Sequence, residues 1–224
     1  MPGNKPSFEV VIFDLDGTLL DTLDDLGAAV NQTLSHSGFP LHTQEEYRKM
    51  VGHGIRNLVT RALPEDRQGD ACLIDERLAD FKAYYTAHIA VHTHPYPGMQ
   101  ELLSDLYKDG VHLAVASNKF QSGTERLVRQ FFPDIHFVAI LGNSPGSPLK
   151  PDPAIVEEVL RRAGTDKSKA VLVGDSGTDM LTARNGGIQG IAVSWGYRPM
   201  TREPGLTVVS SVNELRDLLW SAQP

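Results

Sequence analysis

Short apolar segments rich in β-branched residues recur along this chain, and their pattern predicts buried strands. The first spans Phe8–Leu15, and the others all follow residue 110. Continuous apolar runs of this length are typical of strands that are covered on both faces of a parallel sheet. The later segments are Val111–Ala116, Ile135–Leu141, Ala170–Val173, Gly190–Ser194 and a weaker one at Leu206–Val209.

Helical patterns separate the later strands. Residues Met99–Asp109 place three leucines on one face, and Gly110 follows where a helix would end. Strands that alternate with helices form right-handed βαβ units, which build a parallel sheet with helices on both faces. The chain is therefore predicted to have an α/β, Rossmann-like fold.

The stretch between the first strand and the later ones has a different pattern, without convincing strands. Its apolar spacing predicts helices at Leu23–Gly38, Gln44–Val51, Ile55–Leu63 and Asp70–Ala90. We therefore predict an α-helical cap domain, residues 20–92, inserted after the first strand of a core formed by residues 1–19 and 93–224. The two crossings, Leu19–Thr22 and Val91–Pro97, are the expected hinges.

Composition narrows the classes of partner and compartment. The 224 residues carry a formal net charge of -7, which disfavours nucleic acid and anionic membranes as partners. The single cysteine, Cys72, allows no internal disulfide and is expected to fill the core. No signal peptide or membrane-length apolar run is evident, so we expect a cytoplasmic protein.

Polar residues follow several of the predicted strands. In parallel sheets, ligands bind at the carboxyl ends of the strands. Asp14 and Asp16 end the first strand, two residues apart, and Gly17 permits a sharp turn after them. Buried carboxylates are costly unless they are paired or bind a metal. This strand end is therefore a candidate site.

Three further segments complete the candidate site. Ser117 and Asn118 follow the second strand, Lys150 lies between prolines, and Asp175 and Asp179 flank a Gly-rich turn. Four converging carboxylates would repel one another unless a hard cation such as Mg²⁺ joined them. A lysine and a hydroxyl beside that cation would hold a phosphate group.

Together these motifs resemble the phosphatase branch of the haloacid dehalogenase superfamily over nearly the whole chain. Asp14–Thr18 matches the first motif of that family, Ser117 the second, Lys150 the third and Gly174–Asp179 the fourth. The dehalogenase branch does not carry the second aspartate, Asp16. The segments most similar to the phosphoglycolate phosphatases are Gly17–Thr22, Val51–Arg56 and Tyr96–Gly98.

The resemblance implies a mechanism on a small phosphate ester. Asp14 would form an aspartyl phosphate, Asp16 would act as general acid and base, and Lys150 and Ser117 would neutralise the phosphate. The implied cofactor is Mg²⁺, held by Asp14, the Asp16 carbonyl and Asp175, with Asp179 close by. Asn118 would assist phosphate binding, Arg56 would bind a substrate carboxylate, and His53 would lie beside it in a cap loop facing the site.

Several alternatives remain open at this point. A phosphomutase resembling β-phosphoglucomutase would share the same core residues, and a non-catalytic phosphate-binding regulator or a receiver-like domain is less consistent with Asp16. His88, His92 and His94 include the i, i+4 spacing of zinc sites but lack a nearby carboxylate. The sequence predicts a monomer or a homodimer without distinguishing them.

Overall fold

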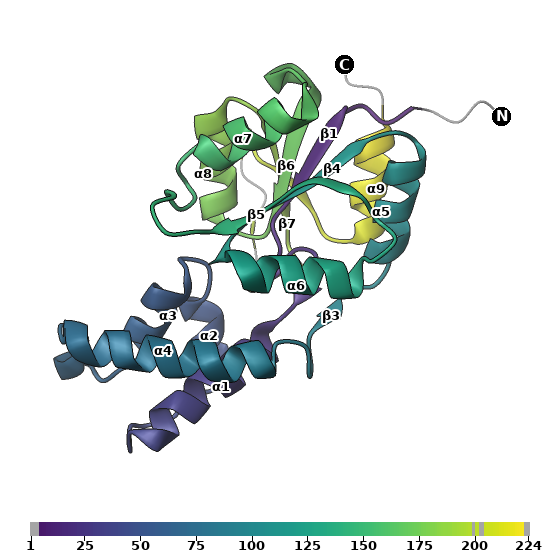
Figure 1. The fold of residues 1–224 in the computed structure, drawn as a ribbon. Coiled ribbons are helices and arrows are strands. Elements are labelled where there is room, and N and C mark those ends of the chain that lie inside the picture. Colours follow the sequence, from purple (N-terminus) through teal and green to yellow (C-terminus); the bar gives the residue numbers. More distant parts are fainter. Residues whose placement is uncertain (1–4, 199, 202–203, 222–224) are drawn as a thin grey trace.

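A six-stranded, wholly parallel sheet forms the centre of the computed structural model, which describes residues 5–198, 200–201 and 204–221 (Figure 1). The strand order is β5-β4-β1-β6-β7-β8. The predicted α/β fold is therefore confirmed, and each apolar run of the sequence overlaps one strand, although β4 and β5 extend beyond the predicted runs. The strands are β1 (Val10–Phe13), β4 (His112–Phe120), β5 (Phe137–Asn143), β6 (Ala170–Gly174), β7 (Gln189–Val193) and β8 (Thr207–Val209).

Helices cover both faces of this sheet, as Figure 1 shows. Alternate residues of β1 point to opposite faces: Val11 and Phe13 join one apolar cluster, and Val10 and Ile12 join the other. The first cluster includes residues of α5 (Met99–Lys108), α6 (Gln121–Phe131) and α9 (Val212–Trp220). The second includes residues of α7 (Ala154–Ala163) and α8 (Gly177–Gly186).

Four helices pack on one another beside the carboxyl ends of the strands, apart from the sheet (Figure 1). We call them the cap helices, and their bounds follow the apolar spacing of the sequence closely. They are α1 (Leu23–His36), α2 (Gln44–Met50), α3 (Ile55–Ala62) and α4 (Ala71–Ala87). The division at residues 19 to 20 and 92 to 93 into two domains stays a prediction.

The two crossings between the sheet and the cap helices are paired with each other. Leu20–Asp21 (β2) runs antiparallel to His94–Pro95 (β3), so a short two-stranded ribbon joins the two parts. The sequence analysis expected no strand here. Two-residue strands are too short to produce a recognisable alternation of apolar and polar residues, and only their pairing across more than 70 positions defines them.

Two expectations that rested on composition can be compared with the structure. Cys72 is exposed, so the prediction that it fills the core is wrong. The buried face of α4 carries Ile74, Phe81 and Tyr85, and Cys72 lies roughly 200° around the helix from Ile74. Among the described residues, no helix combines the length and the apolar character needed to span a membrane.

Candidate active site

Three strand ends meet at the centre of the sheet and bring the candidate residues together. Strand β1 lies between β4 and β6, with Phe13 opposite both Val115 and Val173. The side chains that follow these positions belong to Asp14, Ser117 and Asp175, which are 8%, 3% and 4% exposed. These three residues therefore lie near the carboxyl ends of parallel strands, where the sequence analysis placed them.

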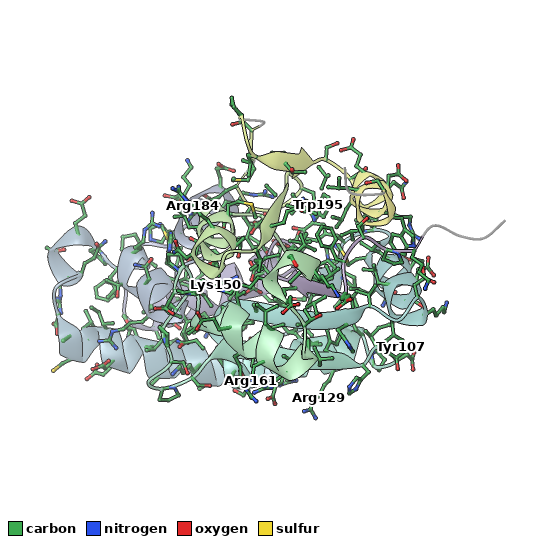
Figure 2. The ribbon with its side chains drawn as sticks, turned by 90° about the horizontal axis from the view of Figure 1, so that it is seen from above. Tyr107, Arg129, Lys150, Arg161, Arg184 and Trp195 are labelled. Atoms are coloured by element: carbon green, nitrogen blue, oxygen red, sulfur yellow. The ribbon has the colours of Figure 1, made fainter. Side chains whose placement is uncertain are left out.

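Lys150 is the cation at the centre of this cluster. Its Nζ donates to Asp14 Oδ1 at 2.8 Å, to Asp179 Oδ1 at 2.6 Å and to the Ala116 carbonyl at 2.8 Å. Burial acts to lower the pKa of Lys150, but the two carboxylates outweigh it and raise that pKa above its usual value. Figure 2 shows Lys150 inside the molecule, whereas Arg129 and Arg161 lie at its edge. Lys150 is thus a fixed positive charge.

Three buried carboxylates lie together here, and Lys150 binds two of them, Asp14 and Asp179. Ligand oxygens of Asp14, Asp175 and Asp179 all lie within 4.8 Å of one another. Burial raises the pKa of Asp14 to about 7, although Lys150 opposes the shift. Burial, together with the neighbouring Asp14 and Asp179, also raises the pKa of Asp175 well above its usual value. This excess of negative charge on oxygen donors fits the requirements of a hard divalent cation.

The carboxylates differ in how fully their oxygens are used within the protein. Asp179 Oδ1 binds Lys150, and Asp179 Oδ2 accepts hydrogen bonds from the Ser176 amide at 3.1 Å and the Ser176 hydroxyl at 2.5 Å. Asp14 and Asp175 each have one oxygen for a ligand, because among the described residues Asp14 accepts only from Lys150 and Asp175 accepts only from the Tyr197 amide, at 2.8 Å. Both Asp179 oxygens are therefore engaged, by Lys150 and by Ser176.

Two glycines pack directly against the Asp175 carboxylate. A Cβ at Gly17 would lie 2.3 Å from Asp175 Oδ2, and a Cβ at Gly196 would lie at the same distance. Gly17 also has a φ of 86°, a backbone conformation that residues with a side chain rarely adopt. The turn after the first motif must therefore be glycine for Asp175 to approach it.

Asp16 lies outside the carboxylate cluster and has a different lysine. Its Oδ1 accepts hydrogen bonds from the Thr22 hydroxyl at 2.6 Å and from Lys119 Nζ at 3.0 Å. Lys119 Nζ also donates to the Tyr85 hydroxyl on α4 at 2.8 Å. The sequence analysis assigned no role to Lys119, although it shares a strand face with Ser117 two residues earlier.

Asn118 is engaged with main-chain groups. Its amide nitrogen donates to the carbonyls of Gly52 and Lys150, and its Oδ1 accepts from the Lys150 amide at 2.8 Å. Both polar atoms of the side chain are therefore used to hold the segment at Lys150 and the cap loop at Gly52. The contacts favour a positioning role for Asn118, whereas the sequence analysis predicted phosphate binding.

Asp14 and Asp16 lie in a pocket between the strand ends and the cap helices, and the cap loop presents different residues to it than predicted. Arg56 pairs with Asp75 on the cap itself, and both Arg56 and His53 line a separate cleft. Arg198, which follows β7, lines the main pocket instead. The lining is Asp14, Asp16, Leu26, Val51, Gly52, Gly54, Ile55, Leu58, Ser117, Asn118, Lys119, Lys150, Asp175, Ser176, Thr178, Tyr197 and Arg198.

The three histidines that precede and enter β3 do not form a metal cluster. Within residues 5–198, 200–201 and 204–221, only Asp14, Asp175 and Asp179 form a group of three possible metal ligands. The Nδ1 atoms of His88 and His94 each lie 2.9 Å from a main-chain carbonyl oxygen, those of Tyr84 and His92. The zinc spacing of the sequence is therefore not used here.

Comparison with known proteins agrees with this geometry. The model of the haloacid dehalogenase-like hydrolase family matches residues 11–193. A phosphoglycolate phosphatase of Mesorhizobium japonicum is 38% identical over 189 residues, 84% of this chain and 83% of that protein. Phosphoglycolate phosphatase 1 of Pseudomonas aeruginosa is 35% identical over 215 residues, 94% of this chain and 78% of that protein.

A crystal structure from Lactobacillus delbrueckii subsp. bulgaricus has the same fold. It has a TM-score of 0.87 at 32% sequence identity, and the match covers 95% of this chain and 99% of that one. The family model spans most of the chain. This chain belongs to the haloacid dehalogenase-like hydrolases.

Proposed function

We propose that this enzyme is a Mg²⁺-dependent phosphatase that hydrolyses a small phosphomonoester similar to 2-phosphoglycolate, through an aspartyl phosphate on Asp14. The observation that carries the proposal is the buried contact of Lys150 Nζ with Asp14 at 2.8 Å, beside Asp175 at the end of the central strand. The names of the two curated relatives support 2-phosphoglycolate as the first substrate to test.

Asp14 is the proposed nucleophile. Its carboxylate attacks phosphorus, so that an Asp14 O–P bond forms while the bond from phosphorus to the ester oxygen breaks. A carboxylate and a phosphate dianion repel each other, and the fixed charge on Lys150 offsets part of that repulsion. Ser117, 3% exposed within β4, is the proposed hydroxyl donor to a phosphate oxygen.

Asp16 is the proposed general acid and base. It gives a proton to the departing alkoxide and later takes one from the water that hydrolyses the intermediate. Asp14 and Asp16 both line the pocket, but they contact different lysines, Lys150 and Lys119. This separation supports different roles for two carboxylates of the same motif.

The metal would be held by the carboxylates of Asp14 and Asp175, with the main-chain carbonyl of Asp16 as a further proposed ligand. Both carboxylates have a pKa raised by burial, which favours a site that accepts a cation. When bound, Mg²⁺ would supply charge neutralisation for the phosphate oxygens. Asp179 would keep Lys150 in place next to it.

Arg198 is the proposed partner of a substrate carboxylate. Its guanidinium donates to the Lys49 and Val51 carbonyls at 3.0 and 2.7 Å, which orients it at the pocket. Among the described residues it has no carboxylate partner, whereas Arg56 pairs with Asp75. An arginine with donors to spare favours an ester that carries a second anionic group.

The first test is phosphate release from a panel of small phosphomonoesters that includes 2-phosphoglycolate. We expect release that needs Mg²⁺, is abolished by EDTA and is lost in Asp14→Asn. Isomerisation of a sugar monophosphate without phosphate release would favour the phosphomutase, and binding without turnover would favour a regulator. Cytoplasmic location and a monomeric or homodimeric state belong to the same proposal.

A further inference from the structure

Lys119 is a buried lysine that the mechanism above does not use. It lies near the end of β4 and is 3% exposed. Its Nζ contacts both Asp16 oxygens, at 3.0 and 3.3 Å, and the Tyr85 hydroxyl at 2.8 Å. Burying an ammonium group is costly unless its donors are satisfied, so these contacts must be retained whenever the site is closed.

The Asp16 carboxylate is held from two sides. On one side the Thr22 hydroxyl donates to Asp16 Oδ1 at 2.6 Å, and the Tyr197 hydroxyl lies 2.9 Å from that Thr22 hydroxyl. On the other side Lys119 donates to the same Oδ1. Within the part of the chain that the structure describes, Asp16 Oδ2 has only the 3.3 Å contact with Lys119, so it is the oxygen left to exchange a proton with a substrate.

Tyr85 brings the cap helices into this arrangement. It lies on α4, its ring stacks on Phe81 at 5.3 Å, and it meets the Phe120 ring edge-on at 6.2 Å. Lys119 Nζ lies 4.6 Å from the centre of the Tyr85 ring, so both the ring and the hydroxyl stabilise the ammonium group. These contacts exist only while α4 is docked against the end of β4.

We propose that Lys119 is a positioning residue for Asp16, and that Tyr85 makes this positioning depend on docking of the cap helices. The inference rests on the proposed function, because it concerns the group that protonates the leaving oxygen. Undocking α4 would remove one of the three Lys119 contacts and free its side chain to move away from Asp16. Asp16 is then correctly placed only when the pocket is closed.

A pair of esters with different leaving groups tests this inference. Benzyl phosphate releases a poor alkoxide that needs a proton, whereas p-nitrophenyl phosphate releases a stabilised phenolate that does not. Asp16→Asn provides the reference, and its kcat for benzyl phosphate should fall by roughly 10²–10⁴-fold, with a much smaller loss for p-nitrophenyl phosphate. A residue that positions Asp16 must reproduce this selectivity.

Two variants probe the lysine and the tyrosine separately, at saturating substrate. Lys119→Met should lower kcat for benzyl phosphate by about 10–100-fold more than for p-nitrophenyl phosphate, a part of the general-acid contribution. Tyr85→Phe keeps the ring and removes the hydroxyl. It should lower kcat for benzyl phosphate by about 3–10-fold more than kcat for p-nitrophenyl phosphate. Tyr84→Phe, one residue earlier on α4, is the matched control and should leave both rates unchanged.

The double variant Asp16→Asn/Lys119→Met separates positioning from a general loss of structure. If Lys119 acts through Asp16, its removal should add no further selectivity once Asp16 is gone. Equal losses for both esters in Lys119→Met and Tyr85→Phe, with a selective Asp16→Asn, would overturn the inference and leave the proposed function intact. Failure of the unmodified enzyme to release phosphate from either ester would overturn both.

Discussion

Asp25 on α1 provides a prediction about how the cap helices are attached, and it does not depend on the proposed chemistry. The side chain is 3% exposed and accepts hydrogen bonds from three consecutive amides of the second crossing. Val91, His92 and Thr93 donate through their main chain at 3.0, 3.0 and 2.9 Å, and the Thr93 hydroxyl donates at 2.7 Å. Among the described residues no cationic side chain pairs with it.

We expect Asp25→Asn to destabilise the protein by about 3 kcal/mol, because it removes the charge to which three main-chain amides and a hydroxyl donate. A hydrogen bond to a charged group contributes about 1.5–3 kcal/mol, but several bonds to one carboxylate do not add fully. The asparagine oxygen can replace some of these contacts. Its NH2 group, however, is a hydrogen-bond donor and would face main-chain N–H groups that also donate.

Urea unfolding followed by circular dichroism would measure this change. Hydrogen exchange would measure local opening, and the amides of Val91, His92 and Thr93 should lose protection first. The matched control is Asp24→Asn on the adjacent, exposed residue, for which a change within about 0.5 kcal/mol is expected. An Asp25→Asn protein with the stability and exchange of the control would refute this reasoning.

Three further changes test the site itself. Arg198→Met should lower kcat/KM for 2-phosphoglycolate by about 10–100-fold and leave kcat/KM for ethyl phosphate nearly unchanged, because only 2-phosphoglycolate has a carboxylate to bind. Arg56→Met is the control in the same steady-state assay. Gly17→Ala places a Cβ 2.3 Å from Asp175 Oδ2, so Mg²⁺ titrations of activity should show a weaker apparent affinity. Asn118→Ala removes contacts to two loops, and a loss of about 1–3 kcal/mol should appear in urea unfolding.

The parallel sheet and its strand ends could be predicted because each depends on short-range sequence features. An apolar run marks a buried strand, and the polar residue after it falls at the ligand-binding edge wherever the strand lies in the sheet. Asp14 and Asp175 follow this rule directly, whereas Ser117 follows its apolar run but lies within β4, which continues to Phe120. Lys150 does not directly follow a strand, and its role was predicted from the resemblance to the family.

The contacts between the cap helices and the strand ends could not be predicted in the same way. Arg56 is the second residue of α3, next to the Gly52–Gly54 segment that was expected to face the core, and its direction depends on how α3 packs against α4, where Asp75 meets it. Tyr85 has the spacing of an ordinary buried helix residue, and only the docking of α4 places its hydroxyl at Lys119. Such contacts depend on the relative placement of two packed units, which local periodicity does not encode.

The two aspartates of the first motif show why the lysines matter more than the spacing between the carboxylates. In an extended strand Asp14 and Asp16 would share a face and an environment, but the chain turns at Gly17, and the Gly17 amide donates to the Leu20 carbonyl at 2.9 Å. Asp14 is thereby left in the cluster with Lys150, whereas Asp16 is directed to Thr22 and Lys119. Asp14 therefore pairs with Lys150 and Asp16 pairs with Lys119, so the two carboxylates do not compete for one buried cation. The proposed nucleophile and the proposed proton donor can then lie within one short motif and still have different surroundings, and Lys119 contributes to that difference as Lys150 does.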